Sequence, residues 1–227
     1  MSHPSWPSVV WQLYSWDYEP NASYFGAQKA GEPIHVQMNL PECKVAVINH
    51  HSQPLEQATV VATIFDLSGQ KVQECRVNFT AAANACTNLC TIDWPAHGAH
   101  FAQLKLFDKS GNLISQNFYW HAREESDLRE LATLPNVNLF AKSRRTGNST
   151  GTIIKARITN ATKVPALSIK LSLRDSQTGK RILPAYYDDN YFSLMPGESR
   201  EISVNCGASG NKMHLELAGW NIVHSTF

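Results

Sequence analysis

Two adjacent aspartates, Asp188 and Asp189, are the residues whose type and spacing best suit acid–base chemistry. On a tight loop, neighbouring carboxylates can both reach one cleft, where carboxylates act as general acids, general bases or nucleophiles. The competing interpretation is structural, because neighbouring side chains tend to diverge and aspartate favours turns. Aromatic residues flank the pair: Tyr186, Tyr187, Tyr191 and Phe192. A loop of this kind also suits packing or contact with a partner domain, so the residues alone leave both interpretations open.

The thiols and imidazoles do not form a convincing metal site. The five cysteines are too few and too irregularly spaced for a disulfide framework: Cys43, Cys75, Cys86, Cys90 and Cys206. Cys86 and Cys90 lie close in sequence, but no second pair lies at zinc spacing. We expect free thiols first, a disulfide second and a metal site last. The neighbouring His50 and His51 are expected in a loop, since adjacent rings on a strand face opposite sides. We expect no cofactor.

The charge balance argues against two classes of partner. Lys plus Arg number 20 and Asp plus Glu number 19, which gives a formal net charge of +1. Without a strong positive field, neither nucleic acid nor an anionic membrane surface is an expected partner. No apolar run reaches the ~18 residues of a membrane span, and the start of the chain lacks the regions of a signal peptide. The compartment stays open.

The first thirty residues are unusually aromatic. Three of the six tryptophans lie there, followed by further rings: Trp6, Trp11 and Trp16, then Tyr14, Tyr18, Tyr24 and Phe25. Each aromatic side chain can bury ~150–250 Å², so this segment needs a partner surface and is expected to be cut from a larger body. Helical spacing of apolar residues over 7–30, interrupted at Glu19–Asn21, predicts a helix, a turn and a second short helix.

An internal repeat follows the aromatic segment. Residues 47–55 run into a longer strand pattern over 58–66, and about 110 residues later residues 157–167 run into a similar pattern over 168–175. Each copy has a strand, a polar turn led by Asn49 or Asn160, a proline, a longer strand and a glycine-containing turn. A period this long indicates two duplicated domains, because solenoid units are about 20–50 residues long.

Period-two patterns define the strands. Ile169, Leu171 and Leu173 alternate with Lys170, Ser172 and Arg174, so one face is expected in the core and the other in water. The same alternation recurs over 154–159 and 213–217. Short strands separated by Asp, Ser, Gly and Pro turns predict antiparallel sandwiches with about seven strands in each half. The fold class is therefore all-β, with two tandem immunoglobulin-like sandwiches after a short helical segment.

Four sequence motifs resemble the C-terminal region of glycoside hydrolase family 2 enzymes. The most extensive is RILPAYYDDNYFSLMPGES at 181–199, and the others are WPSVVWQLY at 6–14, YFGAQKAGEPIHVQ at 24–37 and NFYW at 117–120. Gly219-Trp220-Asn221 is also similar to the mannosylglycoprotein endo-β-mannosidases. The resemblance is to the β-mannosidase and exo-β-glucosaminidase branch and extends over nearly the whole chain.

The resemblance implies a domain plan and a missing active site. Enzymes of this branch place two immunoglobulin-like domains after a catalytic β/α barrel. The expected parts are a barrel remnant at 1–33, a first sandwich at 34–122, a linker at 123–135 and a second sandwich at 136–227. Family 2 enzymes use two carboxylates for retaining hydrolysis, and both belong to the preceding barrel. The acid/base glutamate of this family follows an asparagine, and the chain contains no Asn-Glu pair. The chain alone is therefore expected to be inactive.

The same resemblance suggests which residues contact sugar in an intact enzyme. Trp6 resembles an aromatic at the rim of the barrel, where active sites of that fold lie. Asp188, Asp189 and Tyr191 are the further candidates for the substrate cleft. The expected partners are the preceding barrel and β-mannosides or amino-sugar glycans. Two functions remain in competition: non-catalytic domains that buttress the barrel and shape its cleft, or an independent glycan- or protein-binding module.

Overall fold

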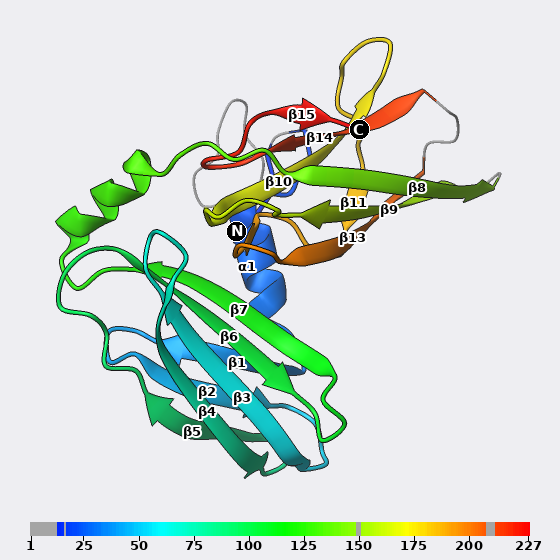
Figure 1. The fold of residues 1–227 in the computed structure, drawn as a ribbon. Helices are drawn as coiled ribbons and strands as arrows, with labels where there is room; N and C mark the ends of the chain where they lie inside the picture. Colours follow the sequence, from blue (N-terminus) through cyan, green and yellow to red (C-terminus); the bar gives the residue numbers. More distant parts are fainter. Residues whose placement is uncertain (1–12, 16, 149–150, 208–211) are drawn as a thin grey trace. The chain divides into compact units, whose positions relative to one another are not determined.

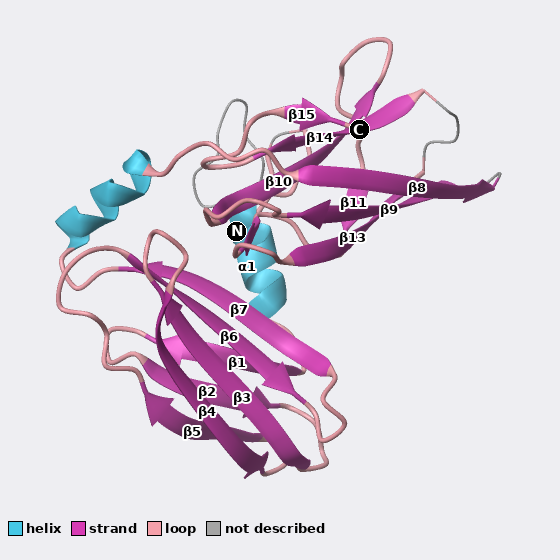
Figure 2. Cartoon of the chain, viewed as in Figure 1, coloured by secondary structure: helices cyan, strands magenta, loops and turns pink. Residues whose placement is uncertain are grey.

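The regular secondary structure of the described residues is mostly antiparallel β-strand, as the sequence predicts. The computed structural model describes residues 13–15, 17–148, 151–207 and 212–227. Helix is limited there to α1 (Ala22–Ala30) and the 3-10 helix η1 (Glu125–Thr133), which Figure 2 separates from the strands by colour. Among these residues no helix is long and apolar enough to cross a membrane. The first helix expected in the N-terminal segment falls mainly on residues outside the described ones.

The chain divides into two compact units. Among the described residues, the first sandwich unit contains 28–134, and the second sandwich unit contains those from 135 to 227 together with 13–15 and 17–27. The N-terminal segment therefore belongs with the half of the chain that is farther away in sequence. α1 runs across the boundary between Ala27 and Gln28.

The first sandwich unit consists of two antiparallel sheets. One has the order β1 (Ile34–Asn39), β2 (Lys44–Asn49) and β5 (Ala85–Thr91). The other has the order β4 (Lys71–Ala81), β3 (Leu55–Phe65), β6 (His100–Phe107) and β7 (Leu113–His121), and both are drawn in Figure 1. Inward-facing aliphatic residues of both sheets, such as Val47, Val60 and Leu104, form one core. The core exists because alternate residues along each strand face the opposite sheet.

Residues 125–133 pack on this first unit. Asp127 Oδ2 accepts a hydrogen bond of 2.8 Å from the Gly98 N–H, and Glu130 Oε2 accepts one of 3.1 Å from the Ala99 N–H. Leu131 is buried. The two carboxylates satisfy backbone donors before β6, so η1 has tertiary contacts of its own.

The second sandwich unit repeats the two-sheet plan. Its first sheet has the order β11 (Ala185–Tyr187), β13 (Ser199–Cys206), β9 (Gly151–Thr159) and β8 (Phe140–Asn148). Its second has β12 (Phe192–Leu194), β10 (Ala166–Asp175), β14 (Met213–Ala218) and β15 (Ser225–Thr226). The predicted inward residues Ile154, Leu171 and Leu215 are each 1% exposed. The period-two patterns therefore identify the core of this unit correctly.

One expectation for a polar position is wrong. Ser172, expected on a solvated face, is only 4% exposed, because the N-terminal segment covers it. Of the later tryptophans, Trp94 is buried, Trp120 is half-buried and Trp220 is 55% exposed. His50 and His51 lie in a loop, as predicted.

Candidate functional site

The structure gives each candidate aspartate a separate backbone or side-chain partner. Asp188 follows β11, where its N–H donates to Ser203 O at 3.1 Å and its Oδ1 accepts from the Ser203 N–H at 2.9 Å. Asp189 pairs instead with Arg200, whose Nη1 lies 2.6 Å from Oδ2. Both members of that ion pair are mostly buried, and the Arg200 guanidinium lies 4.8 Å from the centre of the Phe192 ring. Each carboxylate is thus engaged with β13 by a different residue.

Side chains next to the aspartates hydrogen-bond a buried stretch of the β10 edge. Asn190 is 4% exposed, and its amide bonds both backbone groups of Leu171, accepting from N–H at 2.8 Å and donating to C=O at 2.9 Å. The Tyr187 hydroxyl accepts from the Leu173 N–H at 2.8 Å. Burial raises the pKa of this phenol, so Tyr187 is a neutral hydrogen-bonding group at all ordinary pH values. This part of the long motif satisfies backbone groups that no strand pairs.

Tyr191, the third predicted residue of the loop, connects it to the N-terminal segment. Its backbone has a φ of 55°, in the left-handed region that non-glycine residues seldom adopt. Its ring lies 6.0 Å from the ring of Phe25 on α1, and Lys170 Nζ lies 5.7 Å from its centre. Phe25 is 4% exposed within the core of the second unit. Trp6, the fourth predicted residue, lies outside the described residues.

Two acidic residues ahead of α1 hold the N-terminal segment against the second sandwich unit. Asp17 and Glu19 both pair with the guanidinium of Arg181, which lies more than 160 positions away in sequence. Glu19 Oε1 also lies 3.1 Å from Lys170 Nζ and 3.4 Å from the Ser172 hydroxyl, which donates to it. We call these five residues the acidic clasp. The clasp covers polar side chains on β10 that the period-two pattern predicts to face water.

The charges of the clasp are reflected in the pKa of Asp17. Partial burial raises this pKa, but the hydrogen bond from Ser15 and the positive charge of Arg181 lower it more, so the net shift is downward from 3.8. The carboxyl side chains of Asp17 and Glu19 are 18% and 14% exposed, so solvent screens their ion pairs less than a typical surface pair. Asp17 is therefore ionised at neutral pH and attracted to Arg181.

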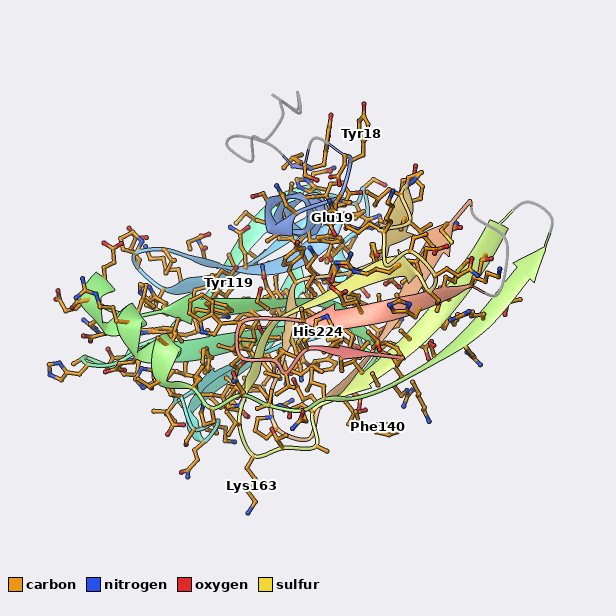
Figure 3. All side chains as sticks on the ribbon, turned by 90° about the horizontal axis from the view of Figure 1, so that it is seen from above. Tyr18, Glu19, Tyr119, Phe140, Lys163 and His224 are labelled. Atoms are coloured by element: carbon orange, nitrogen blue, oxygen red, sulfur yellow. The ribbon has the colours of Figure 1, made fainter. Side chains whose placement is uncertain are left out.

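A tyrosine-lined pocket lies beside the clasp. It has a volume of about 410 Å³ and is lined by Tyr14, Asp17, Tyr18, Pro20, Tyr24, Leu183, Pro184, Ala185 and Tyr186. The rings of Tyr14 and Tyr18 stack at 5.8 Å. Tyr18 and Tyr186 are 65% and 63% exposed, and Figure 3 shows Tyr18 pointing away from the ribbon. No feature of the sequence alone predicts this pocket, because its two sides come from segments more than 150 positions apart.

No metal site is formed by the described residues. Within them, no three His, Cys, Asp or Glu side chains gather as ligands. All five cysteines are free thiols, of which Cys43 and Cys206 are buried. The arrangement therefore offers carboxylates held by cations, hydroxyls and aromatic faces. These groups suit polar packing and contact with carbohydrate or protein.

The two units match two related protein families. Residues 117–222 match the family described as exo-β-D-glucosaminidase Ig-fold domain, and residues 42–123 match the family described as mannosidase Ig/CBM-like domain. An exo-β-D-glucosaminidase of Streptomyces avermitilis is 28% identical over 100% of this chain. A mannosylglycoprotein endo-β-mannosidase of Lilium longiflorum is 24% identical over 95% of it.

A solved structure agrees with these matches. The crystal structure of the exo-chitosanase of Amycolatopsis orientalis has a TM-score of 0.89 to this chain, covers 98% of it and is 25% identical. The chain spans only 28% of the Streptomyces relative, 30% of the Lilium relative and 29% of the exo-chitosanase. The resemblance inferred from the motifs is confirmed: the chain consists of the tandem immunoglobulin-like domains of the exo-β-glucosaminidase and mannosidase branch of glycoside hydrolase family 2.

Proposed function

We propose that this chain is the accessory C-terminal region of a retaining family 2 glycosidase and that its second sandwich unit anchors the segment leaving the catalytic barrel. The proposed parts are the barrel remnant at 1–33, the sandwiches at 34–122 and 136–227, and the linker at 123–135. The partner is the preceding barrel, and the substrates of the intact enzyme are β-mannosides or amino-sugar glycans. The catalytic carboxylates belong to that barrel.

One observation carries this proposal. The segment that resembles the exit from the barrel is held on the second sandwich unit by the acidic clasp and by the packing of Phe25 against Tyr191. These contacts fix the end of the segment at a defined place on a rigid sandwich. An anchored end restricts how the last barrel helix can move, which preserves the position of active-site groups at the barrel rim.

In this proposal, the predicted cleft residues of the aspartate loop mainly hold other parts of the chain in place and do not themselves contact the sugar. Asp188 and Asp189 hold the loop to β13, and Tyr191 contacts the anchored segment. Trp6 lies eleven positions before Asp17. In this proposal it stacks on sugar in the intact enzyme, because aromatic faces suit the apolar faces of sugars. The loop thus shapes the cleft indirectly, by supporting the chain that leads back to Trp6.

A chimera tests the proposal. The matching C-terminal part of the Amycolatopsis orientalis exo-chitosanase is replaced by this chain, and hydrolysis of an aryl β-glucosaminide is measured together with thermal stability. We expect an active chimera, a lower melting temperature with Arg181→Ala, and little change with Lys155→Ala, whose Nζ lies 3.7 Å from Glu201 on an exposed face. A folded chimera in which Arg181→Ala and Lys155→Ala behave alike would contradict the anchoring role.

The expected inactivity of the chain itself has a direct assay. Purified chain is incubated with aryl β-mannoside and aryl β-glucosaminide substrates. We expect no turnover above buffer, because the barrel carboxylates are not part of this sequence. Turnover that Asp188→Ala abolishes would refute the accessory assignment and make the aspartate loop an active site.

The tyrosine-lined pocket favours a second candidate, an independent glycan-binding module. Tyrosine rings combine a flat apolar face with a polar hydroxyl, which suits carbohydrate, and two of the rings are more than half exposed. Titration of mannose- and glucosamine-containing oligosaccharides against the isolated chain separates the candidates. Saturable binding that Tyr186→Ala weakens supports the module, whereas absence of binding up to millimolar glycan supports the anchor.

A further inference from the structure

Two half-buried cysteines lie on neighbouring strands of different sheets in the first sandwich unit. Cys75 is on β4, the edge strand of one sheet, and Cys90 is on β5, the edge strand of the other. A short turn over residues 82–84 joins the two strands, which Figure 1 shows side by side. Both cysteines lie about the same number of residues from that turn, so the connection brings them to similar heights along the sandwich.

The strand registers point both thiols toward the space between the sheets. Cys75 pairs with Ala62 on β3, and Cys90 pairs with Val45 on β2. Ala62 and Val45 are core residues with 1% and 0% exposure, and residues directly opposite in a sheet point to the same side. Both cysteines pack against this core. Their side chains therefore converge from the two sheets.

A bulge turns Cys90 inward. The pairing of β2 with β5 shifts register between Val45 and Ala46, so Leu89 is the extra residue on β5. An extra residue reverses which of the following residues face inward. Cys86, four positions earlier on the same strand, is exposed. The bulge thus separates an outward cysteine from an inward one on a single strand.

From this geometry we propose that Cys75 and Cys90 are a redox pair that closes into a disulfide between the two sheets. The oxidant is a second disulfide, such as oxidised glutathione. The thiolate of one cysteine attacks it, forms a mixed disulfide and releases one glutathione thiolate. The thiolate of the other cysteine then attacks the protein sulfur of the mixed disulfide and releases the second glutathione. Two protein thiols are oxidised, and one glutathione disulfide is reduced to two thiols.

The environment of the pair makes closure slow at neutral pH. Burial, together with the hydrogen bond and the charge of Cys75, raises the pKa of Cys90 to about 12. A thiol with a raised pKa forms little thiolate, which is the attacking species. The closing step is intramolecular, so its rate does not depend on the oxidant concentration. Closure becomes faster as pH rises, because both steps need a thiolate.

The remaining cysteines are not suited to the same reaction. Cys43 and Cys206 are buried, and Cys206 belongs to the second sandwich unit. Cys86 is exposed on the outer face of β5 and is the natural control. The pairing is thus specific among five thiols.

Thiol counting and peptide mapping test the pair. The full chain is treated with oxidised glutathione at pH 8, the remaining thiols are alkylated under denaturing conditions, and peptides are identified by mass spectrometry. We expect one cross-linked peptide containing Cys75 and Cys90, formed with loss of two hydrogens from the protein, whereas the exposed Cys86 is found alkylated or carrying a glutathione adduct and not in a cross-link. Closing a loop of about 15 residues should raise the melting temperature of the first unit by roughly 10 °C.

Three variants make the result decisive. Cys75→Ser and Cys90→Ser should each abolish the cross-link and leave a glutathione adduct on the remaining partner or none, whereas Cys86→Ser should cross-link like the unsubstituted chain. A cross-link that uses Cys86, or five alkylated thiols after long oxidation of the folded chain, would overturn the proposal. The peptide mapping of the unsubstituted chain tests the proposal by itself. The test therefore stays valid even if a serine variant folds poorly.

Discussion

The two sandwich units share a hydrogen-bonded turn and differ in how the strand after that turn is paired. In both, a buried asparagine stabilises the turn that follows an early strand. Asn49 donates to Gln53 O and Ala82 O at 3.0 Å each and accepts from His51 N–H at 3.0 Å. Asn160 donates to Val164 O at 2.8 Å and Leu194 O at 3.0 Å and accepts from Thr162 N–H at 3.1 Å. The two copies of the internal repeat therefore share the hydrogen bonds of this asparagine as well as the order of their strands.

The difference lies in what pairs with the next strand. In the first unit, β3 pairs along most of its length with β4. In the second unit, the chain that follows the equivalent strand β10 makes an isolated bridge between Arg174 and Arg181 and then crosses to the other sheet as β11. It returns as the short strand β12, which pairs with β10 only at Ala166 and Ile169. Pro184 lies in this crossing, and a proline has no N–H to donate to a ladder.

As a consequence, side chains hydrogen-bond the backbone along this edge of β10, and the N-terminal segment covers it. Asn190 and Tyr187 bond the backbone of Leu171 and Leu173, at the edge that corresponds to the β4-paired edge of β3 in the first unit. Arg181, at the point of crossing, holds Asp17 and Glu19. In the first unit this edge of the sheet is paired with another strand of the same unit. In the second unit the corresponding edge binds the N-terminal segment.

Replacing either turn asparagine by alanine should have the largest effect. Asn49 and Asn160 are each 0% exposed, and their side chains make three and four hydrogen bonds, so truncation removes the amide donor from two carbonyl groups in each unit. We expect Asn49→Ala and Asn160→Ala each to lower the free energy of unfolding of its own unit by about 3 kcal/mol. Hydrogen exchange measured peptide by peptide assigns each loss to a unit.

The two asparagine variants also test the repeat itself. Equal losses in the two units mean that the shared hydrogen bonds have equal energetic weight. If one variant lowered the free energy of unfolding of its unit by less than about 0.5 kcal/mol while the other had the full effect, the two asparagines would be alike in geometry but not in their contribution to stability.

Asn190→Ala addresses the side-chain closure of β10. It removes both bonds to Leu171, and because the site is 4% exposed we expect a loss of about 2 kcal/mol in the second unit. Asn78→Ala is the control, since Asn78 accepts from Thr59 on the exposed face of the β3–β4 pair and should cost at most about 0.5 kcal/mol. Equal effects would mean that the edge does not depend on Asn190.

Sequence reasoning predicts the parts of this comparison that are local. Alternation identifies Ile169, Leu171 and Leu173 as a buried row, because each residue's side follows from its place on the strand. The asparagine-led turns are visible for the same reason. The switch of β11 to the other sheet is not predicted, since strand partners are chosen by tertiary packing rather than by local pattern.

The site illustrates the same limit. Asp188 and Asp189 are visible as a pair, but their separate partners, Ser203 and Arg200, lie more than ten positions away. The acidic clasp involves still longer separations, and nothing in the alternation of β10 indicates that Lys170 and Ser172 receive Glu19. Only the resemblance to longer enzymes suggests that the aromatic segment has a defined place.

Arg181→Ala should release the N-terminal segment without unfolding the sandwich. It removes the ion pairs to Asp17 and Glu19 while Lys170 still holds Glu19, so we expect local opening of residues 17–27 to increase about tenfold. Hydrogen exchange of the peptide that contains Phe25 measures this opening. Lys155→Ala should leave that peptide unchanged, and equal exchange in both variants would show that the clasp is not what retains the segment.

The smallest predicted effect is a pH dependence carried by Asp17. Its pKa in the folded chain lies below 3.8 despite partial burial, because the hydrogen bond from Ser15 and the charge of Arg181 favour the carboxylate. The stabilisation is therefore complete above the unfolded pKa and is lost as pH falls through the folded pKa. We expect carbon NMR of the Asp17 carboxyl to give a pKa below 3.8, and a higher value in Arg181→Ala. Asp66 also has a lowered pKa, where the hydrogen bonds of its own turn outweigh burial, and it should not respond to Arg181→Ala. A shift of both aspartates would indicate a general change in the chain, whereas a shift of Asp17 alone assigns the acid sensitivity to the clasp, the feature that the first unit lacks.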